Sequence, residues 1–167
     1  MRGRIREFRW ADLGAILRIE ANAFPKTPYD LVTFLYFASA YRDNFRVYVA
    51  GHEVVGYIIF YPDGHIVSVA VHARYRRSGI GTELVGEVLK RTRGDAIVEV
   101  RESNEVARAF YSHLGFAMQR IIPGYYGDED AVVMINPFSK EKGFTEKGLR
   151  SKEIRFFYSC TQREDRD

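Results

Sequence analysis

The sequence has 167 residues, of which 46% are apolar and 14% aromatic, so it can build one sizeable core and is not a disordered chain. The longest apolar runs are short and the charged N-terminus has no apolar centre, which argues against a membrane span and a secretory signal. Cys160 is the only cysteine and the four histidines lack ligand spacing, so neither a disulfide nor a metal is expected. A soluble, cytoplasmic protein is therefore predicted.

Helical spacing predicts two helices in the first part of the chain. One runs from about Asp12 to Ala23, with Asp12 or its neighbour as the cap. The second begins at Thr27-Pro28, where a Thr cap and a Pro at the first helical position agree with each other. Its apolar stripe consists of Leu31, Phe34, Leu35 and Ala38.

From Phe45 the apolar period changes to two, which predicts a meander of three strands at 45–49, 54–61 and 65–72. A helix to about Arg93 follows, closed by Gly94 in a left-handed conformation. The apolar stripe of this helix consists of Gly81, Leu84, Val85, Val88 and Leu89.

The remaining elements are a buried strand at 96–100, a helix capped by Ser103 or Asn104, and two strands at 116–122 and 131–136. The apolar stripe of this helix consists of Val106, Ala109, Phe110 and Leu114. Strands and helices in this order indicate a mixed sheet with helices on both faces, in the α/β or α+β class. We expect residues 1–137 to form the domain and residues 138–167 to be a charged extension.

Residues 74–85 read RYRRSGIGTELV and join a strand to a helix. Free backbone N–H groups at such a helix start attract phosphate, and the arginines add charge-assisted contacts. Walker and dinucleotide-binding motifs require a different spacing of glycine and lysine. The pattern favours an anion site, and the alternative is a solvated basic turn.

Arg76 to Gly81 resembles the R/Q-x-x-G-x-G/A motif of the GNAT N-acetyltransferases, and the likeness extends over about residues 5–137. Three further segments, 99–104, 109–116 and 125–134, resemble the RimI-like protein N-terminal acetyltransferases. The resemblance implies a GNAT fold, with a mostly antiparallel, twisted sheet of about seven strands. It also implies acetyl-CoA as the co-substrate, with no metal.

The resemblance assigns the donor to two segments. The strand at 66–71 would carry the pantetheine arm and the acetyl carbonyl, and the turn after it would hold the pyrophosphate. The implied cofactor-binding residues are Val69, Ala70, Val71, Arg76, Arg77, Ser78, Gly79, Ile80, Gly81, Thr82, Asn104 and Tyr111.

Glu99 and Tyr111 are the implied catalytic base and acid. Glu99 is a carboxylate within an apolar strand, and the alternative is a side chain that reaches solvent at the strand end. Tyr111 shares a helix face with Asn104 and Ala107, away from the apolar stripe. Its alternative is an ordinary amphipathic tyrosine with a packed ring and a hydrated hydroxyl.

The substrate side, also by resemblance, consists of Phe24 and Pro25 in one turn and Tyr125 and Tyr126 in another. Lys26-Thr27 follows Phe24-Pro25, where bacterial members often carry Trp, so the sequence departs from those members here. The acidic turn at 128–130 carries no assigned role.

The leading hypothesis is an acetyl-CoA-dependent enzyme that acetylates the α-amine of a protein or peptide N-terminus by direct transfer, as a monomer or homodimer. The alternatives are an acetyltransferase for lysine or small-molecule amines, and a non-catalytic acyl-CoA sensor. A nucleic-acid partner is not expected, because the basic stretch at 74–93 lacks interleaved aromatic residues beyond Tyr75.

Overall fold

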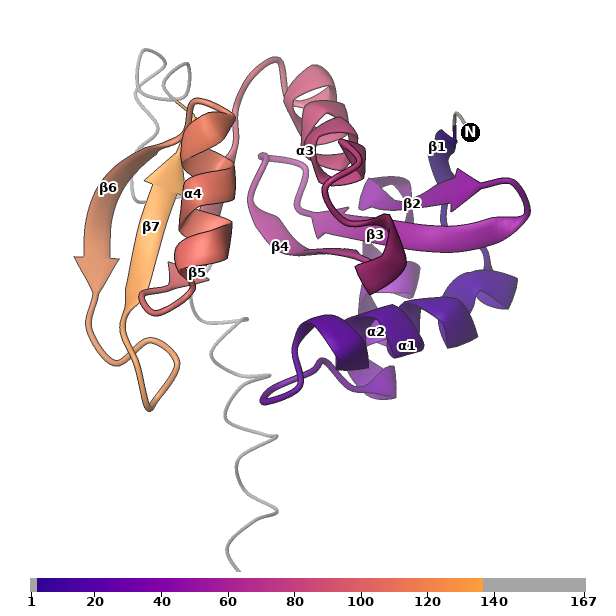
Figure 1. Ribbon diagram of the computed structural model, residues 1–167, viewed down its shortest axis with the longest axis horizontal. Helices are drawn as coiled ribbons and strands as arrows, with labels where there is room; N and C mark the ends of the chain where they lie inside the picture. Colours follow the sequence, from indigo (N-terminus) through magenta and orange to yellow (C-terminus); the bar gives the residue numbers. More distant parts are fainter. Residues whose placement is uncertain (1–2, 137–167) are drawn as a thin grey trace, which may run out of the picture. The chain divides into compact units, whose positions relative to one another are not determined.

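The computed structural model describes residues 3–136, which form two compact units, residues 3–96 and 97–136 (Figure 1). The predicted charged extension, Cys160 included, lies outside the described residues. None of the helices within residues 3–136 has the length and apolar character needed to cross a membrane.

The first unit consists of a four-stranded antiparallel sheet in the order β1-β2-β3-β4, and three α-helices. Its strands are β1 (Arg4–Glu7), β2 (Phe45–Ala50), β3 (Glu53–Phe60) and β4 (Ile66–Val71). Its helices are α1 (Leu13–Ala23), α2 (Leu31–Ala40) and α3 (Ile80–Arg91), with short 3-10 turns at Trp10–Asp12, Arg42–Asn44 and Ala73–Tyr75.

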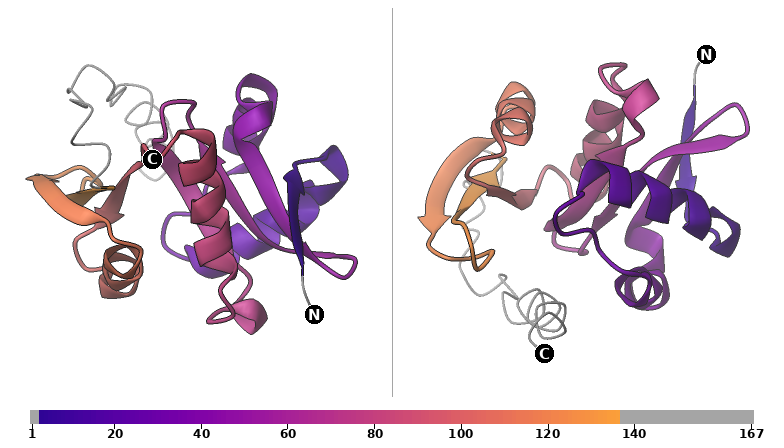
Figure 2. Two further views of the ribbon diagram at one scale, coloured as in Figure 1. Left: turned by 90° about the horizontal axis from the view of Figure 1, so that it is seen from above. Right: turned by 60° about the horizontal axis from the view of Figure 1, so that its bottom comes forward.

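Helices cover both faces of this sheet, as predicted (Figure 2). Gly56 and Tyr57 are neighbours on β3, so they face opposite sides of the sheet. A Cβ on Gly56 would lie 3.3 Å from side-chain atoms of Ile80 and Leu84 on α3. The Tyr57 hydroxyl donates to Glu20 on α1, and its ring packs on Phe34 of α2. α3 therefore covers one face, and α1 and α2 cover the other.

The predicted cap position of α1 is confirmed, since Asp12 precedes the first residue of the helix, whereas the predicted cap of α2 is corrected. Asp12 closes a 3-10 turn, where its carboxylate accepts from the Arg9 N–H and binds Arg6 through two bonds of 2.6 and 2.8 Å. α2 begins after Asp30, whose side chain accepts from the Thr33 N–H at 2.8 Å. The Thr27 cap was wrong because the helix begins three residues later, where the Asp30 carboxylate accepts from a first-turn N–H.

The buried stripe of α2 also differs from the prediction. Phe34, Phe37 and Ala38 are buried, whereas Leu31 is 46% exposed and Leu35 is 37% exposed. Aromatic packing sets this helix phase, because the Phe34 ring meets Phe45 and Tyr57 on one side of the sheet.

β1 was missed because its sequence alternates charged residues with a single isoleucine and carries no apolar period. Pairing with β2 forms it, with Ile5 opposite Tyr48.

The second unit is a three-stranded antiparallel sheet in the order β5-β7-β6, with α4 beside it (Figure 2). Its elements are β5 (Ile97–Arg101), α4 (Glu105–His113), β6 (Ala117–Ile122) and β7 (Ala131–Ile135). Ile97, Val133 and Ile135 form its buried cluster, with Ile122 packed against them. The α/β class and the number of strands are confirmed, and the strands are divided between two sheets.

The apolar stripe predicted for α4 is corrected too. Val106 is 71% exposed, and the most buried side chain of the helix is Tyr111, at 3%. Asn104, Ala107 and Arg108 share the less exposed face with Tyr111. The hydrophobic residues misled the prediction because this helix buries a mixed polar face.

Candidate functional site

The turn before α3 has the backbone geometry of an anion-binding site. Gly79 caps the helix with φ 86°, a left-handed conformation that favours glycine, and a Cβ there would meet no atom within 4 Å. The first three N–H groups of α3, at 80–82, have no acceptor within the helix, whereas the Glu83 N–H donates to the Gly79 carbonyl. These free donors and the positive end of the helix dipole lie at the helix start. Phosphate oxygens fit such a position.

The basic side chains of this turn lie at the surface. Arg76, Arg77 and Ser78 are exposed, as is Thr82 in the first turn of α3. Arg76 Nε donates to the carbonyl of Val71 at 3.1 Å, which ties the turn to the end of β4. The turn is thus held in place while several donors remain exposed to solvent.

Gly81 is half-buried on the face of α3 that carries the buried Leu84, Val85 and Val88. Ile80, which was not predicted to be on this stripe, is 5% exposed and extends it. The close approach of helix to sheet depends on Gly56, whose Cβ would lie 3.1 Å from the Ala70 carbonyl oxygen. The sequence signal for Gly56 was a glycine within an apolar strand, which often marks a close backbone approach.

β4 is an edge strand of the first unit's sheet, so it presents backbone groups that β3 does not use. His72 N–H donates to Val55 on β3, and the antiparallel alternation then directs Ala70 N–H toward β3 as well. The N–H groups of Val69 and Val71 therefore point away from β3. Of the three predicted residues of this strand, these two offer outward backbone donors.

A buried polar network holds the turn that contains Phe24 and Pro25. Glu20, which is 2% exposed, accepts from the Tyr29 N–H at 2.9 Å and from the Tyr57 hydroxyl. Ser68 Oγ lies 2.9 Å from the same Tyr57 oxygen. Burial raises the pKa of Glu20 above its ordinary value. The network fixes the α1–α2 connection to β3 and β4.

Sequence reasoning missed Glu20, although a signal for it exists. Glu20 lies three residues after Leu17 and four after Ile16, so it shares a helix face with these two apolar residues. A carboxylate at such a position is either paired or exposed, and here it is paired.

Glu99 and Tyr111, the predicted base and acid, are brought close together in the second unit. Tyr111 is buried and packs edge-on against Phe110, with Phe116 at 5.2 Å between ring centroids. Burial and the nearby Glu99 carboxylate raise the pKa of Tyr111 well above its usual range. Glu99 itself is half-buried on β5. The second unit thus places a neutral hydroxyl and a carboxylate near each other.

Asn104 is the N-cap of α4, which confirms one of the two predicted candidates, Ser103 and Asn104. Its side-chain oxygen accepts from the Ala107 N–H at 3.0 Å. The cap uses the amide oxygen, so the amide nitrogen is the group with which Asn104 could donate to a ligand.

Tyr125 and Tyr126 lie in the loop between β6 and β7, with ring centroids 4.9 Å apart. The Tyr126 hydroxyl donates to the Glu99 carbonyl at 3.1 Å, and the Arg101 guanidinium lies 4.3 Å from the Tyr126 ring centroid. Tyr126 is thereby held against the same strand that carries Glu99.

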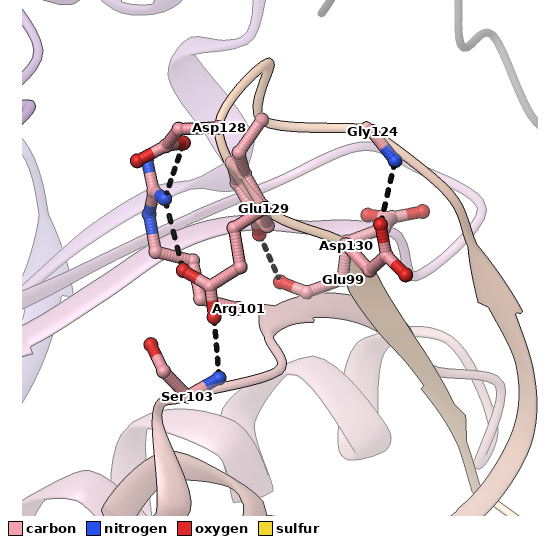
Figure 3. A network of polar contacts seen from close by, with 8 residues as sticks. Glu99, Arg101, Ser103, Gly124, Asp128, Glu129 and Asp130 are labelled. Carbon is pink, nitrogen blue, oxygen red and sulfur yellow. Dashed lines mark hydrogen bonds and ion pairs between the residues drawn. The ribbon is translucent and has the colours of Figure 1, made fainter.

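The acidic turn 128–130 braces this loop (Figure 3). Arg101 forms ion pairs with Asp128 at 2.9 Å and Glu129 at 3.2 Å. Hydrogen bonds from Ser103 hold the pKa of Glu129 below its usual range, and Asp130 accepts from the Gly124 N–H. Sequence reasoning missed Arg101, because its carboxylate partners lie 27 and 28 residues further along the chain.

The comparisons with known proteins agree with this arrangement. Residues 5–116 match the family described as Acetyltransferase (GNAT) family. An N-acetyltransferase of Methanocaldococcus jannaschii is 40% identical over 148 residues, which cover 83% of this chain and 94% of that protein. An N-alpha-acetyltransferase of Sulfurisphaera tokodaii is 34% identical, with coverage of 80% and 92%.

Two crystal structures resemble this chain, each at about 30% sequence identity. Ard1 from Thermoplasma volcanium superimposes with a TM-score of 0.73 at 31% identity, covering 81% of this chain and 97% of that one. The ribosomal-protein-S18-alanine N-acetyltransferase from Escherichia coli has a TM-score of 0.68 at 30% identity, with coverage of 81% and 94%. The predicted family is therefore confirmed, and the chain belongs to the GNAT acetyltransferase family.

Proposed function

We propose that this chain is a protein Nα-acetyltransferase, which transfers the acetyl group of acetyl-CoA directly to the α-amine of a protein or peptide N-terminus. We assign the activity to residues 1–137. Relatives named N-alpha-acetyltransferase and ribosomal-protein-S18-alanine N-acetyltransferase support this substrate class.

The observation that carries the proposal is the pairing of Glu99 with a buried Tyr111 whose pKa is raised. Acetyl transfer to an amine needs an acceptor for the amine proton and a donor for the leaving thiolate. In our proposal the amine nitrogen forms a bond to the acetyl carbon as the C–S bond breaks. Glu99 accepts the amine proton through water, and the Tyr111 hydroxyl gives its proton to the CoA sulfur.

The donor fits the groups of the first unit. The left-handed Gly79, the first-turn N–H groups of α3, and Arg76 and Arg77 suit a pyrophosphate, since these provide both hydrogen bonds and positive charge. The outward N–H groups of Val69 and Val71 suit an acetyl carbonyl, where they would stabilise the developing negative charge on oxygen.

An N-terminal amine suits this pair of catalytic residues better than lysine does. An α-amine has a pKa of about 7.7 to 8.0, against about 10.4 for lysine, so its neutral fraction at pH 7 is larger by roughly two orders of magnitude. Phe24, Pro25, Tyr125 and Tyr126 would contact the first residues of the peptide. The Tyr125 hydroxyl can donate to the peptide backbone, and the Tyr126 hydroxyl, whose proton goes to the Glu99 carbonyl, can accept from a peptide N–H.

Acetyl transfer to a panel of peptides that differ in their first two residues tests the proposal. Each peptide is matched by an N-terminally blocked copy with an internal lysine. We expect acetylation of free N-termini, with loss of turnover in the Glu99→Gln, Tyr111→Phe double variant.

Transfer to blocked peptides alone would favour a lysine acetyltransferase. Binding of acetyl-CoA with no transfer to any amine would favour an acyl-CoA sensor. Unchanged turnover in the double variant would overturn the roles of Glu99 and Tyr111 while leaving the substrate class intact.

A further inference from the structure

A cleft lined by arginines lies in the first unit, away from the turn that precedes α3 in the sequence. Its volume is about 350 Å³, and residues of β1, β2 and the 42–44 turn line it. The lining residues are Arg6, Glu7, Phe8, Arg9, Arg42 and Arg46. Four of these six side chains are guanidinium groups.

The carboxylates near the cleft do not balance this charge. Asp12 accepts two hydrogen bonds from Arg6, and the same carboxylate also attracts the Arg9 guanidinium electrostatically. Glu7 is 3.4 Å from Arg46. Arg42 has no ion pair within the described residues 3–136. The lining itself therefore holds four arginines and one carboxylate, Glu7, which leaves it electropositive.

Arg46 distinguishes this cleft from an ordinary basic surface. Its side chain is 7% exposed, and its Nε donor is buried without an acceptor among the described residues. An arginine on a solvated face keeps its donors in water. Arg46, on β2, instead keeps its Nε–H buried at the cleft without an acceptor, which costs free energy unless a bound ligand supplies one.

We propose that this cleft binds a small phosphate-bearing anion, at a site separate from the α3 turn. Guanidinium groups present paired N–H donors that match phosphate oxygens, so arginine is well suited to such ligands. The volume lies near the lower end for small-molecule sites, which fits a compact anion. The stacked rings of Phe8 and Phe45, 4.5 Å apart, support the cleft from within the core.

The test measures binding of inorganic pyrophosphate by titration calorimetry at low salt. It uses the Arg76→Glu, Arg77→Glu variant, in which the α3 turn no longer attracts anions. Arg42→Gln is then added, and Arg18→Gln serves as the matched control, because Arg18 is also exposed and lies on α1 outside the cleft. Arg46→Gln is a second variant, with its fold checked by circular dichroism.

We expect the Arg76→Glu, Arg77→Glu protein to bind pyrophosphate. Arg42→Gln should weaken this binding about tenfold or more, while Arg18→Gln should change it less than twofold. Equal affinities of the Arg42→Gln and Arg18→Gln proteins would overturn the proposal. So would complete loss of pyrophosphate binding on changing Arg76 and Arg77 alone, since the α3 turn would then be the binding site. Peptide acetylation should be unchanged in Arg42→Gln, so this test is independent of the catalytic assignment.

Discussion

Replacing Gly56 with alanine should shift α3 slightly away from β3, on which it packs. The new Cβ would lie 3.1 Å from the Ala70 carbonyl oxygen and 3.3 Å from side-chain atoms of Ile80 and Leu84. These distances are shorter than ordinary van der Waals contact, so α3 must move by a few tenths of an ångström. The movement would affect the N-terminal half of the helix, where the proposed pyrophosphate site lies.

The expected cost follows from this overpacking. An extra buried methyl group in a tight core costs about 1–3 kcal/mol. Alanine returns about 0.4–1 kcal/mol, because it restricts the unfolded chain more than glycine does. With the middle of each range the net loss is about 1.3 kcal/mol, which for a chain of this length lowers the melting temperature by roughly 3–5 °C.

Gly86→Ala on the same helix is the matched control. Gly86 is exposed, and a Cβ there would meet nothing within 4 Å. Alanine should therefore stabilise the helix by about 0.5–1 kcal/mol. Urea unfolding measures both variants, and steady-state kinetics measure KM for acetyl-CoA. We expect KM to rise in Gly56→Ala only. If Gly56→Ala were as stable as Gly86→Ala, the close packing of α3 on β3 would be refuted.

Three further predictions concern side chains of the two units. Arg101→Gln should raise KM for the peptide several-fold and leave KM for acetyl-CoA unchanged, because the β6–β7 loop loses the cation that binds Asp128 and Glu129. Arg108→Gln is the control, since Arg108 donates to the Glu102 carbonyl and not to this loop. Equal effects of the two substitutions would contradict the role of Arg101. Tyr111→Phe should lower kcat by about 10²–10⁴. Burial and the Glu99 charge raise the pKa of Tyr111 above 10.0, so the pH profile of the wild-type kcat should show no tyrosine ionisation below about pH 10. A fall of kcat near pH 8 that is absent in Tyr111→Phe would argue against this. Glu20→Gln should flatten the pH dependence of stability. Burial raises the pKa of Glu20 in the folded chain, so the native state holds the extra proton and stability falls as pH rises from about 4.5; urea midpoints that fall equally in both proteins would count against this.

The sequence was a reliable guide wherever the determining interactions are local. The period of two placed β2, β3 and β4, and Gly94, predicted to be left-handed after α3, has a φ of 95°. The motif at 76–81 placed the start of α3, because its glycine spacing is a property of consecutive residues, and phosphate binding at this helix start stays a prediction.

Contacts between distant residues produced the errors. Leu31 and Leu35 satisfied the helical period of α2, but they are partly exposed. The face with Phe34 and Phe37 is buried instead, because Phe34 packs on aromatic rings of the sheet. Val106 fitted the period of α4 and is exposed, whereas Tyr111 is buried. Hydrophobic period identifies a helix, and only its packing partners decide which face is buried.

The sequence by itself determined the family, the order of the elements and the residue types available for acetyl transfer. Only the tertiary structure decided that a neutral Tyr111 lies beside Glu99, that Arg101 braces the Tyr126 loop, and that β4 turns the Val69 and Val71 N–H groups outward. The physical reason is that burial and pairing depend on atoms far apart in the chain. Such atoms set protonation and orientation without leaving a pattern among neighbouring residues.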